Sequence, residues 1–248
     1  MTAIPVVRSI ILAFLLTAAL LVPGLTRADA PAPPGQSPYV EGPASRDGTG
    51  RFYLGREVGR VMSYTVAPWL DRSTRAQEQL PDRVVAEMGL APDAVVADLG
   101  AGTGYFTFRL SEHVPRGRVY AVDVQPEMID ILRTRVRENG VANVEVVQGS
   151  ETDPGLPPGR VDAVLLVDTY HELSHPFEVM TAVVQALRPG GHVYVVEYRA
   201  EDPRVPIHPL HKMTEAQIRL ELTAVGLTWR ETLDFLPTQH LLVFEKPR

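Results

Sequence analysis

The stretch VVADLGAGTGYF, residues 95–106, decides the fold, because an apolar strand runs directly into a turn with glycine at every second position. Glycine has no Cβ, so such a turn lets the backbone come close to a ligand. We expect a helix from about Thr103 to His113, whose free N–H groups and positive dipole end suit a ligand carboxylate. The stretch therefore predicts a ligand site at the carboxyl end of a buried strand.

Downstream of this turn, strand and helix patterns alternate. Apolar runs and helical spacing predict strands at 118–122, 144–147, 161–167 and 192–198, helices at 125–139, 177–187 and 214–225, and a closing antiparallel hairpin at 228–236 and 240–244. This alternation predicts an α/β fold with a doubly wound, Rossmann-like, mostly parallel sheet and helices on both faces. We assign it to residues 89–248.

The start of the chain has the pattern of a secretory signal peptide. Arg8 precedes the apolar run IILAFLLTAALLV, residues 10–22, and Ala28-Asp29-Ala30 follows as a cleavage sequence. The run is shorter than the roughly 20 apolar residues of a membrane span. We expect residues 1–30 to be a signal peptide cleaved near Ala30, which would export the domain, in a bacterium to the periplasm. The alternative is an uncleaved N-terminal segment that tethers the chain to a membrane.

Two further regions precede the alternating part. Residues 31–50 are rich in proline, glycine and small polar residues and are expected to be a flexible linker. Residues 51–88 show helical spacing and are expected to form two helices, either a lid over the site or a cover for the sheet edge. On that interpretation Arg56 and Arg60 share a solvated helical face.

The amino-acid composition of the chain indicates which kinds of partner it can bind. The chain has 24 Lys and Arg against 30 Asp and Glu, a formal net charge of -6, and no cysteine. An acidic chain without a dense basic cluster is a poor ligand for a phosphate backbone, so nucleic acid is not expected as a partner. Without cysteine there is no disulfide and no thiol nucleophile.

Carboxylates flank the glycine turn. Asp98 stands two residues before Gly100, where it could meet a ligand ammonium, and Asp123 ends the next strand, where it could accept hydrogen bonds from two ribose hydroxyls. Val124 and Met128 could cover an adenine face. The spacing is G-x-G-x-G rather than the dinucleotide pattern G-x-G-x-x-G, and a carboxylate beside a pyrophosphate would be repulsive. The pattern favours S-adenosylmethionine.

Three motifs in order resemble the class I S-adenosylmethionine-dependent methyltransferases: VVADLGAGTGYF, VYAVDVQPEMI at 119–129 and ALRPGGHVYVVEY at 186–198. The resemblance covers about Leu80 to Phe244. It implies a seven-stranded sheet with an antiparallel last strand, and S-adenosylmethionine as cofactor. The cofactor residues it implies are Asp98, Gly100, Ala101, Gly102, Thr103, Gly104, Tyr105, Asp123, Val124, Met128 and Asp168.

One position departs from the family pattern. Many relatives have Gly-Asp after the third strand, where the aspartate meets the adenine amino group, whereas this chain has Gln148-Gly149-Ser150-Glu151. We expect Ser150 or Glu151 to replace that contact, or the contact to be lost.

The residues that follow the fourth strand are candidates for catalysis. Tyr170, His171 and Glu172 are expected to face the methyl acceptor, with Asp168 nearer the donor. His171 is the candidate general base if the acceptor must lose a proton. The alternative is that this stretch only shapes the pocket.

Residues 171–175 also spell H-E-x-x-H, the zinc-protease motif. That motif needs a continuous helix, which Pro176 disfavours at His175. A loop metal site shared with His208 and His211 is a further alternative, and no metal is assigned.

The sequence thus predicts a methyltransferase acting on a small-molecule or lipid-type acceptor. Alternatives are another enzyme of the same fold, an aminopropyltransferase or an NAD-dependent oxidoreductase, and a catalytically silent S-adenosylmethionine-binding module.

Overall fold

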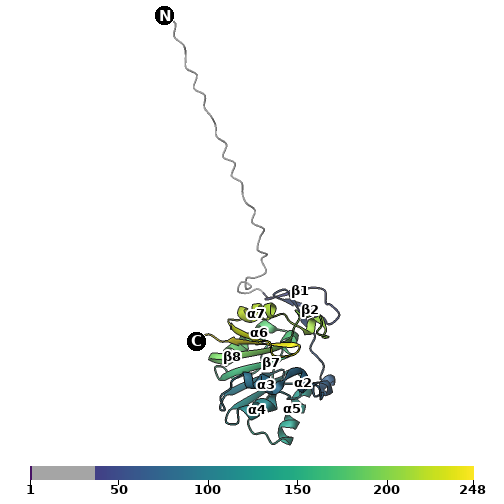
Figure 1. Ribbon diagram of the computed structural model, residues 1–248, viewed down its shortest axis with the longest axis vertical. Coiled ribbons are helices and arrows are strands. Elements are labelled where there is room, and N and C mark those ends of the chain that lie inside the picture. Colours follow the sequence, from purple (N-terminus) through teal and green to yellow (C-terminus); the bar gives the residue numbers. More distant parts are fainter. Residues whose placement is uncertain (2–36) are drawn as a thin grey trace. The chain divides into compact units, whose positions relative to one another are not determined.

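The computed structural model describes Met1 and residues 37–248, and its centre is a seven-stranded sheet of order β6-β5-β4-β7-β8-β10-β9 (Figure 1). The strands are β4 (Val95–Leu99), β5 (Arg118–Asp123), β6 (Val144–Gln148), β7 (Val161–Val167), β8 (Leu187–Tyr198), β9 (Thr228–Leu233) and β10 (Gln239–Glu245). The first five run parallel, and β10 is antiparallel to both β8 and β9. The predicted mostly parallel sheet with an antiparallel last strand is confirmed.

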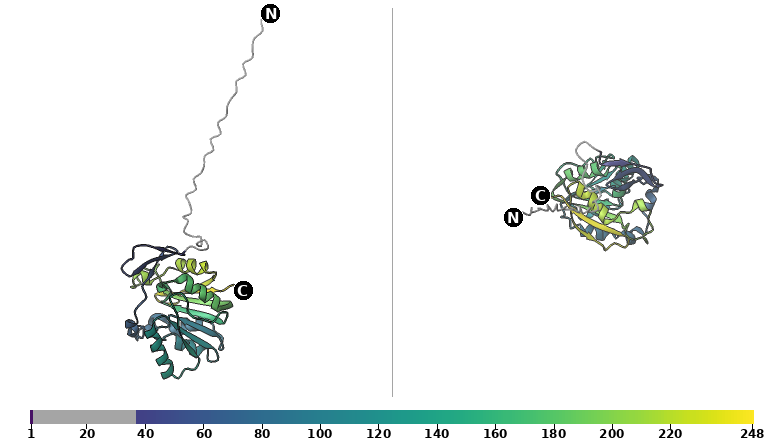
Figure 2. Two further views of the ribbon diagram at one scale, coloured as in Figure 1. Left: turned by 180° about the vertical axis from the view of Figure 1, so that it is seen from behind. Right: turned by 90° about the horizontal axis from the view of Figure 1, so that it is seen from above.

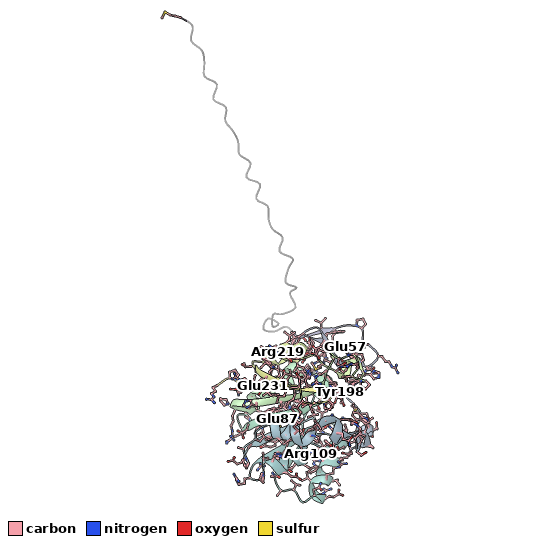
Figure 3. All side chains as sticks on the ribbon, in the orientation of Figure 1. Glu57, Glu87, Arg109, Tyr198, Arg219 and Glu231 are labelled. Atoms are coloured by element: carbon pink, nitrogen blue, oxygen red, sulfur yellow. The ribbon has the colours of Figure 1, made fainter. Side chains whose placement is uncertain are left out.

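Helices cover both faces of this sheet. They are α3 (Pro81–Glu87), α4 (Thr107–His113), α5 (Pro126–Glu138), α6 (Pro176–Ala186) and α7 (Glu215–Ala224). Apolar residues of α3 and α4 pack in one cluster with Leu165, and those of α6 and α7 pack in another with Leu166, because successive strand residues point to opposite faces. Figure 3 shows Glu87 of α3 and Arg109 of α4 in one region of the surface and Arg219 of α7 in another.

Local sequence explains where these helices begin. Proline occupies the first turn of α3, α5 and α6, where its missing N–H costs nothing. Thr214 caps α7 by accepting a hydrogen bond from Gln217 N at 3.1 Å. The predicted helices over this part of the chain agree with the structure to within a few residues.

The N-terminal part differs from the prediction. Residues expected to be linker and helix instead form a three-stranded antiparallel sheet, β1 (Tyr39–Glu41), β2 (Gly48–Tyr53) and β3 (Arg56–Gly59). Leu54 and Gly55 make the β2–β3 turn with φ of 46° and 89°, as a two-residue hairpin turn requires. The side chains of Tyr53 and Val58, which were expected to belong to one helix, are both buried, but they come from two different strands.

Short helical segments link this sheet to the main domain. They are η1 (Tyr64–Val66), α1 (Ala67–Leu70) and α2 (Arg75–Gln79), and the second predicted helix is α3. In Figure 1 the chain passes from the N-terminal sheet, beside α6 and α7, to α2 near α5, and Figure 2 shows the same sheet from behind and from above.

Arg56 attaches the N-terminal sheet to α7. Its Nε and Nη2 donate to the two carboxylate oxygens of Glu221 at 2.6 and 2.8 Å, and the Glu221 side chain is fully buried. The prediction that Arg56 lies on a solvated face is therefore wrong, because the segment is a strand and not a helix. Gln217 adds a hydrogen bond from Nε2 to Leu54 O at 3.1 Å.

The predicted signal peptide, apart from Met1, lies outside the described residues. Within the part of the chain that the structure describes, no helix combines the length and the hydropathy that crossing a membrane requires.

Candidate active site

A cavity opens at the carboxyl ends of β4, β5 and β7, the place where parallel α/β sheets bind ligands. The glycine turn, the end of β5, the stretch after β7 and an N-terminal segment each form part of its wall. The lining residues are Val61, Met62, Ser63, Val66, Trp69, Leu70, Arg75, Leu99, Gly100, Ala101, Gly102, Asp123, Val124, Gln125, Met128, Val167, Asp168, Thr169, Glu172 and Leu173.

The glycine turn forms the floor of the cavity. Gly100 has φ of 78°, and a Cβ at this position would lie 2.3 Å from Thr169 Cγ2. Backbone N–H groups of Gly100 and Ala101 both donate to Val122 O at 2.9 Å, which fixes the turn against β5. The predicted residues Gly100, Ala101 and Gly102 line the cavity, and Thr169 packs so closely on Gly100 that a Cβ there has no room.

Asp123 lies at the end of β5 and faces the same cavity. Its Oδ2 accepts a hydrogen bond from Gly102 N at 3.0 Å and its Oδ1 accepts one from Gln125 N at 2.9 Å. Burial raises the pKa of this carboxyl, against the effect of these hydrogen bonds. Val124 and Met128 lie on the same wall, so the three residues predicted to bind the nucleoside are brought together.

Asp98 does not line the cavity. It is buried behind the glycine turn, where its Oδ2 accepts a hydrogen bond from the Thr107 hydroxyl at 2.6 Å. Burial raises the pKa of Asp98 to about 6. The structure thus gives this residue a supporting place under the turn and not the direct ligand contact that the sequence predicted.

Three other predicted cofactor residues also pack outside the cavity. The Thr103 hydroxyl donates to Asp71 Oδ1 at 2.9 Å, and the Tyr105 ring lies under the guanidinium of Arg109. A Cβ at Gly104 would lie 2.7 Å from the Phe108 ring, so this glycine is needed for packing within the helix region.

Ser150 and Glu151, the residues expected to replace the adenine contact, have other partners. Ser150 Oγ accepts a hydrogen bond from Asp153 N at 3.0 Å in a local turn, and Glu151 is exposed, with a carboxylate oxygen 3.7 Å from His175 Nδ1. Neither residue lines the cavity. Serine at this position closes its own turn and so cannot reach inward as an aspartate would.

Asp168 faces the cavity directly after β7, as predicted. Its φ is 50°, a conformation that non-glycine residues rarely adopt and that is concentrated at functional sites. Gln79 Nε2 donates to its Oδ2 at 2.6 Å and Gln239 Nε2 to its Oδ1 at 2.7 Å. Burial raises the pKa of this carboxyl.

Arg75 places a positive charge in the same cavity, and sequence analysis missed it. Its Nε donates to Gln79 Oε1 at 2.6 Å, its Nη1 donates to Leu70 O at 2.7 Å, and its guanidinium lies 4.2 Å from the centre of the Tyr105 ring. The i, i+4 spacing of Arg75 and Gln79 was visible, but nothing local distinguishes it from a solvated helix face.

Tyr170 does not face the cavity. It is fully buried, and its hydroxyl donates to Glu221 Oε2 at 2.9 Å, in contact with the N-terminal sheet. The structure therefore does not bring Tyr170 together with Glu172 at the cavity, where it was expected to meet the acceptor. The short helix η2 (Tyr170–Glu172) turns this side chain under the sheet instead.

His171 also points away from the cavity. Its Nδ1 lies 2.8 Å from Glu197 Oε2 and its Nε2 lies 3.0 Å from His211 Nδ1. The carboxylate of Glu197 holds the pKa of His171 above its ordinary value, although burial acts most strongly and in the opposite direction. A buried, paired imidazole of this kind is not placed as the predicted general base.

Glu172 is the predicted catalytic residue that does line the cavity. Its Oε2 accepts a hydrogen bond from Met62 N at 2.9 Å. Burial raises the pKa of this carboxyl, and the charge of His171 opposes that rise.

The H-E-x-x-H stretch is not a protease helix. Leu173 is extended, with φ of -62° and ψ of 114°, and His175 begins a separate helix, α6. His175 Nε2 lies 2.7 Å from Arg51 Nη1, so the two histidines contact different partners. The zinc-protease interpretation is excluded by this geometry.

Residues 61–70, here called the cap segment, form one wall of the cavity. The Gln125 side chain holds them: its Nε2 donates to Met62 O at 3.0 Å and its Oε1 accepts from Tyr64 N at 2.8 Å. Trp69 belongs to this wall, as the lid interpretation expects, whereas Tyr53 is buried beside Tyr39 and Phe177.

The strand order, the glycine turn and the aspartate at the end of β5 together give the Rossmann-like arrangement in which S-adenosylmethionine-dependent methyltransferases are built. Comparison with known proteins agrees, because residues 96–191 match the family model described as a methyltransferase domain. A solved structure described as a SAM dependent methyltransferase from Aquifex aeolicus superposes with a TM-score of 0.71 at 26% identity, covering 75% of this chain and all of that one.

Curated relatives match over a shorter region. The chain is 29% identical over 127 residues to demethylmenaquinone methyltransferase of Lactococcus lactis, covering 51% of this chain and 50% of that protein. It is 30% identical over 112 residues to the ubiquinone/menaquinone biosynthesis C-methyltransferase of Ectopseudomonas mendocina, covering 44% of each. The chain thus spans about half the length of the curated relatives it matches. Over residues 96–191 it is similar to a methyltransferase domain, a class of protein whose cofactor is S-adenosylmethionine.

Proposed function

We propose that the protein transfers a methyl group from S-adenosylmethionine to an apolar small-molecule or lipid-type acceptor. One observation carries the proposal: a single cavity is lined by Asp123 with its apolar neighbours and also by a pair of opposite charges, Arg75 and Asp168. The first set suits a nucleoside, and the second suits the two charges of an amino acid.

The residues fit the donor at both of its ends. Asp123 would accept hydrogen bonds from the ribose hydroxyls, with Val124 and Met128 against the adenine. Arg75 would bind the carboxylate and Asp168 the ammonium, each as a charge-assisted contact. Bound S-adenosylmethionine supplies an already activated methyl group. The protein then has to align donor and acceptor and exclude water, which is worth up to about 7–11 kcal/mol in well-oriented systems.

The same charges disfavour the alternatives. A pyrophosphate over the glycine turn would lie close to Asp168 and Glu172, so carboxylate repulsion weighs against an NAD-dependent oxidoreductase. A catalytically silent binding module would hold the donor without methyl transfer, and the experiment below separates it from an enzyme.

An apolar acceptor is supported by the cap segment, which presents Val61, Val66 and Leu70 to the cavity, and by Leu173 opposite. The curated relatives above are named for quinone biosynthesis, which is consistent with an acceptor of this chemistry. Glu172 is the carboxylate placed to accept a proton if the acceptor must lose one, because its raised pKa makes it a stronger base than an exposed glutamate.

The test has two parts. Calorimetry with S-adenosylmethionine, S-adenosylhomocysteine and NAD should give saturable binding to the first two and none to NAD. Transfer of a labelled methyl group should then be screened over quinols, other apolar phenols and lipid extract. Donor binding without transfer to any acceptor would favour the silent module, and binding of NAD alone would overturn the proposal.

We also propose that the domain is exported with residues 1–30 as a leader, on the strength of the apolar run and the cleavage sequence. Fractionation of cells that express the chain with an N-terminal or an internal tag tests this. Export with cleavage removes the N-terminal tag from the exported fraction, whereas recovery of both tags in the cytosol contradicts the proposal.

A further inference from the structure

At the edge of the cavity, two histidines that the methyl-transfer proposal does not use meet Glu172, which lines the cavity. His171 Nε2 and His211 Nδ1 lie 3.0 Å apart, and the ligand atoms of His171, His211 and Glu172 all lie within 4.8 Å of one another. Ligands bound to one tetrahedral ion at about 2.0–2.2 Å lie roughly 3.3 Å apart, close to the 3.0 Å between the two imidazole nitrogens and within the 4.8 Å limit for all three atoms. We propose that these three residues form a binding site for a divalent metal ion such as Zn²⁺.

The surroundings of His171 are those of a metal-binding histidine. Glu197 Oε2 lies 2.8 Å from His171 Nδ1, and Glu197 Oε1 accepts a hydrogen bond from His171 N at 3.1 Å. A carboxylate on the other ring nitrogen fixes the tautomer and directs Nε2 toward the ion, as in carboxylate–histidine–zinc arrangements. The Glu197 side chain is fully buried, so this orientation is held firmly.

The local charge favours a cation. Glu172, Glu197 and Asp168 all act electrostatically on His171. The nearest guanidinium, that of Arg56, donates from Nη1 to His171 O at 3.0 Å, but its charge is already paired with Glu221. A divalent ion would offset this concentration of buried negative charge.

The site joins segments that are distant in the sequence. Glu172 and His171 come from η2, and His211 comes from η3 (Pro209–His211). Gly59 of β3 packs against both, because a Cβ there would lie 3.1 Å from Leu210 O and 3.4 Å from His171 O. Since Glu172 also accepts a hydrogen bond from Met62 N, a bound ion would fasten the start of the cap segment to both loops.

Two imidazoles and one carboxylate select the class of ion. Imidazole nitrogen suits Zn²⁺, Co²⁺ and Fe²⁺, whereas Mg²⁺ and Ca²⁺ prefer oxygen ligands alone. Three protein ligands leave at least one position of a tetrahedral ion for water or for an acceptor oxygen. The neighbouring exposed His208 is not part of this set, because its Nδ1 lies 2.9 Å from Asp47 Oδ2.

The experiment uses the untagged full chain, stripped with a chelator, without any methyl donor. Titration with Co²⁺ followed by visible absorption should show one saturable, low-symmetry site that equimolar Zn²⁺ displaces. His211→Ala and Glu172→Gln should each weaken Co²⁺ binding by at least about tenfold, and Glu197→Gln by roughly 10–100-fold. His192→Ala is the matched control, because His192 pairs with Glu245, with Nε2 3.8 Å from the carboxylate, and is not part of the three-residue set, and it should bind as wild type.

Folding of each variant is checked by circular dichroism, and for His211→Ala and Glu197→Gln also by S-adenosylmethionine binding in the presence of chelator. Co²⁺ affinity that is equal in wild type, His211→Ala and Glu172→Gln would overturn the metal site and leave a hydrogen-bonded histidine pair. Because metal binding is measured without donor and donor binding without metal, failure of one proposal is distinguishable from failure of the other.

Discussion

Asp123 is the side chain on which nucleoside binding depends most directly. Its carboxylate faces the cavity from the end of β5, and hydrogen bonds to a charged acceptor contribute about 1.5–3 kcal/mol each. We predict that Asp123→Ala weakens S-adenosylmethionine binding by at least about tenfold, measured by calorimetry. Asp130→Ala, an exposed aspartate on α5, is the control. Equal affinity in wild type and Asp123→Ala would refute the ribose assignment.

Asp98 links stability to pH. Burial raises its pKa from 3.8 to about 6, so the folded state holds the proton more tightly than the unfolded chain. The stabilising effect of the protonated form is complete below pH 3.8 and is lost as the pH rises through about 6. At pH 7 we predict that ligand-free Asp98→Asn is more stable than wild type, by on the order of 1–3 kcal/mol.

Urea unfolding at several pH values measures this difference. The advantage of Asp98→Asn should shrink as the pH falls from 7 toward 4, where both proteins carry a neutral side chain at this position. A variant that is less stable than wild type at pH 7 would show that the hydrogen bond from Thr107 outweighs desolvation.

At the scale of elements, the glycine turn can be tested with a pair of glycines. Gly100 and Gly140 both have positive φ, of 78° and 61°, but a Cβ meets Thr169 at Gly100 and nothing within 4 Å at Gly140. We predict that Gly140→Ala costs roughly 1 kcal/mol of backbone strain alone. Gly100→Ala should cost more and should also abolish donor binding, as thermal unfolding and calorimetry would show. Retained binding in Gly100→Ala would mean that the turn tolerates displacement.

The cap segment depends on one side chain of the main domain. Gln125 bonds both Met62 O and Tyr64 N, so Gln125→Ala should leave these backbone groups exposed to solvent more often. We predict faster amide hydrogen exchange over residues 61–66 with little change in β7. Gln148→Ala, at the exposed end of β6, is the control. Unchanged exchange would show that apolar packing alone holds the cap.

The elements from Val95 onward could be predicted because each carries its own local signal. The buried strand β7 is apolar apart from Asp162, and prolines and Thr214 mark helix starts. The N-terminal sheet could not be predicted in this way. Its strands are short, and their buried residues Tyr53 and Val58 happen to fall at helical spacing although they belong to different strands.

For the molecule as a whole, the buried Arg56–Glu221 pair holds the N-terminal sheet to α7. Removal of one partner leaves an unpaired buried charge, which typically costs 3–5 kcal/mol. We predict a loss of roughly that size for Arg56→Met in urea unfolding, with part of it recovered in Arg56→Met/Glu221→Gln. A loss below about 1 kcal/mol, the value of an exposed pair, would contradict the buried role.

The candidate site was predictable only where its residues lie at strand ends. Gly100, Asp123 and Asp168 follow strands, and their position in the sheet fixes where they point. Arg75, Gln79 and Gln239 come from distant segments without a motif. Sequence proximity to the strand ends predicted that Asp98, Tyr170 and His171 would lie at the cavity. A change of backbone direction over one residue is enough to point a side chain away from the cavity, as it does for these three.

The Asp168 carboxylate accepts hydrogen bonds from the side-chain amides of Gln79 and Gln239. Gln79 precedes the glycine turn in the sequence, and Gln239 begins the final strand. One of the two hydrogen bonds that hold Asp168 in the cavity wall therefore forms only when β10 has inserted between β8 and β9. A chain still under synthesis lacks that strand, so we expect it to be unable to capture the donor. Donor binding would then report that β10 has been made and inserted into the sheet.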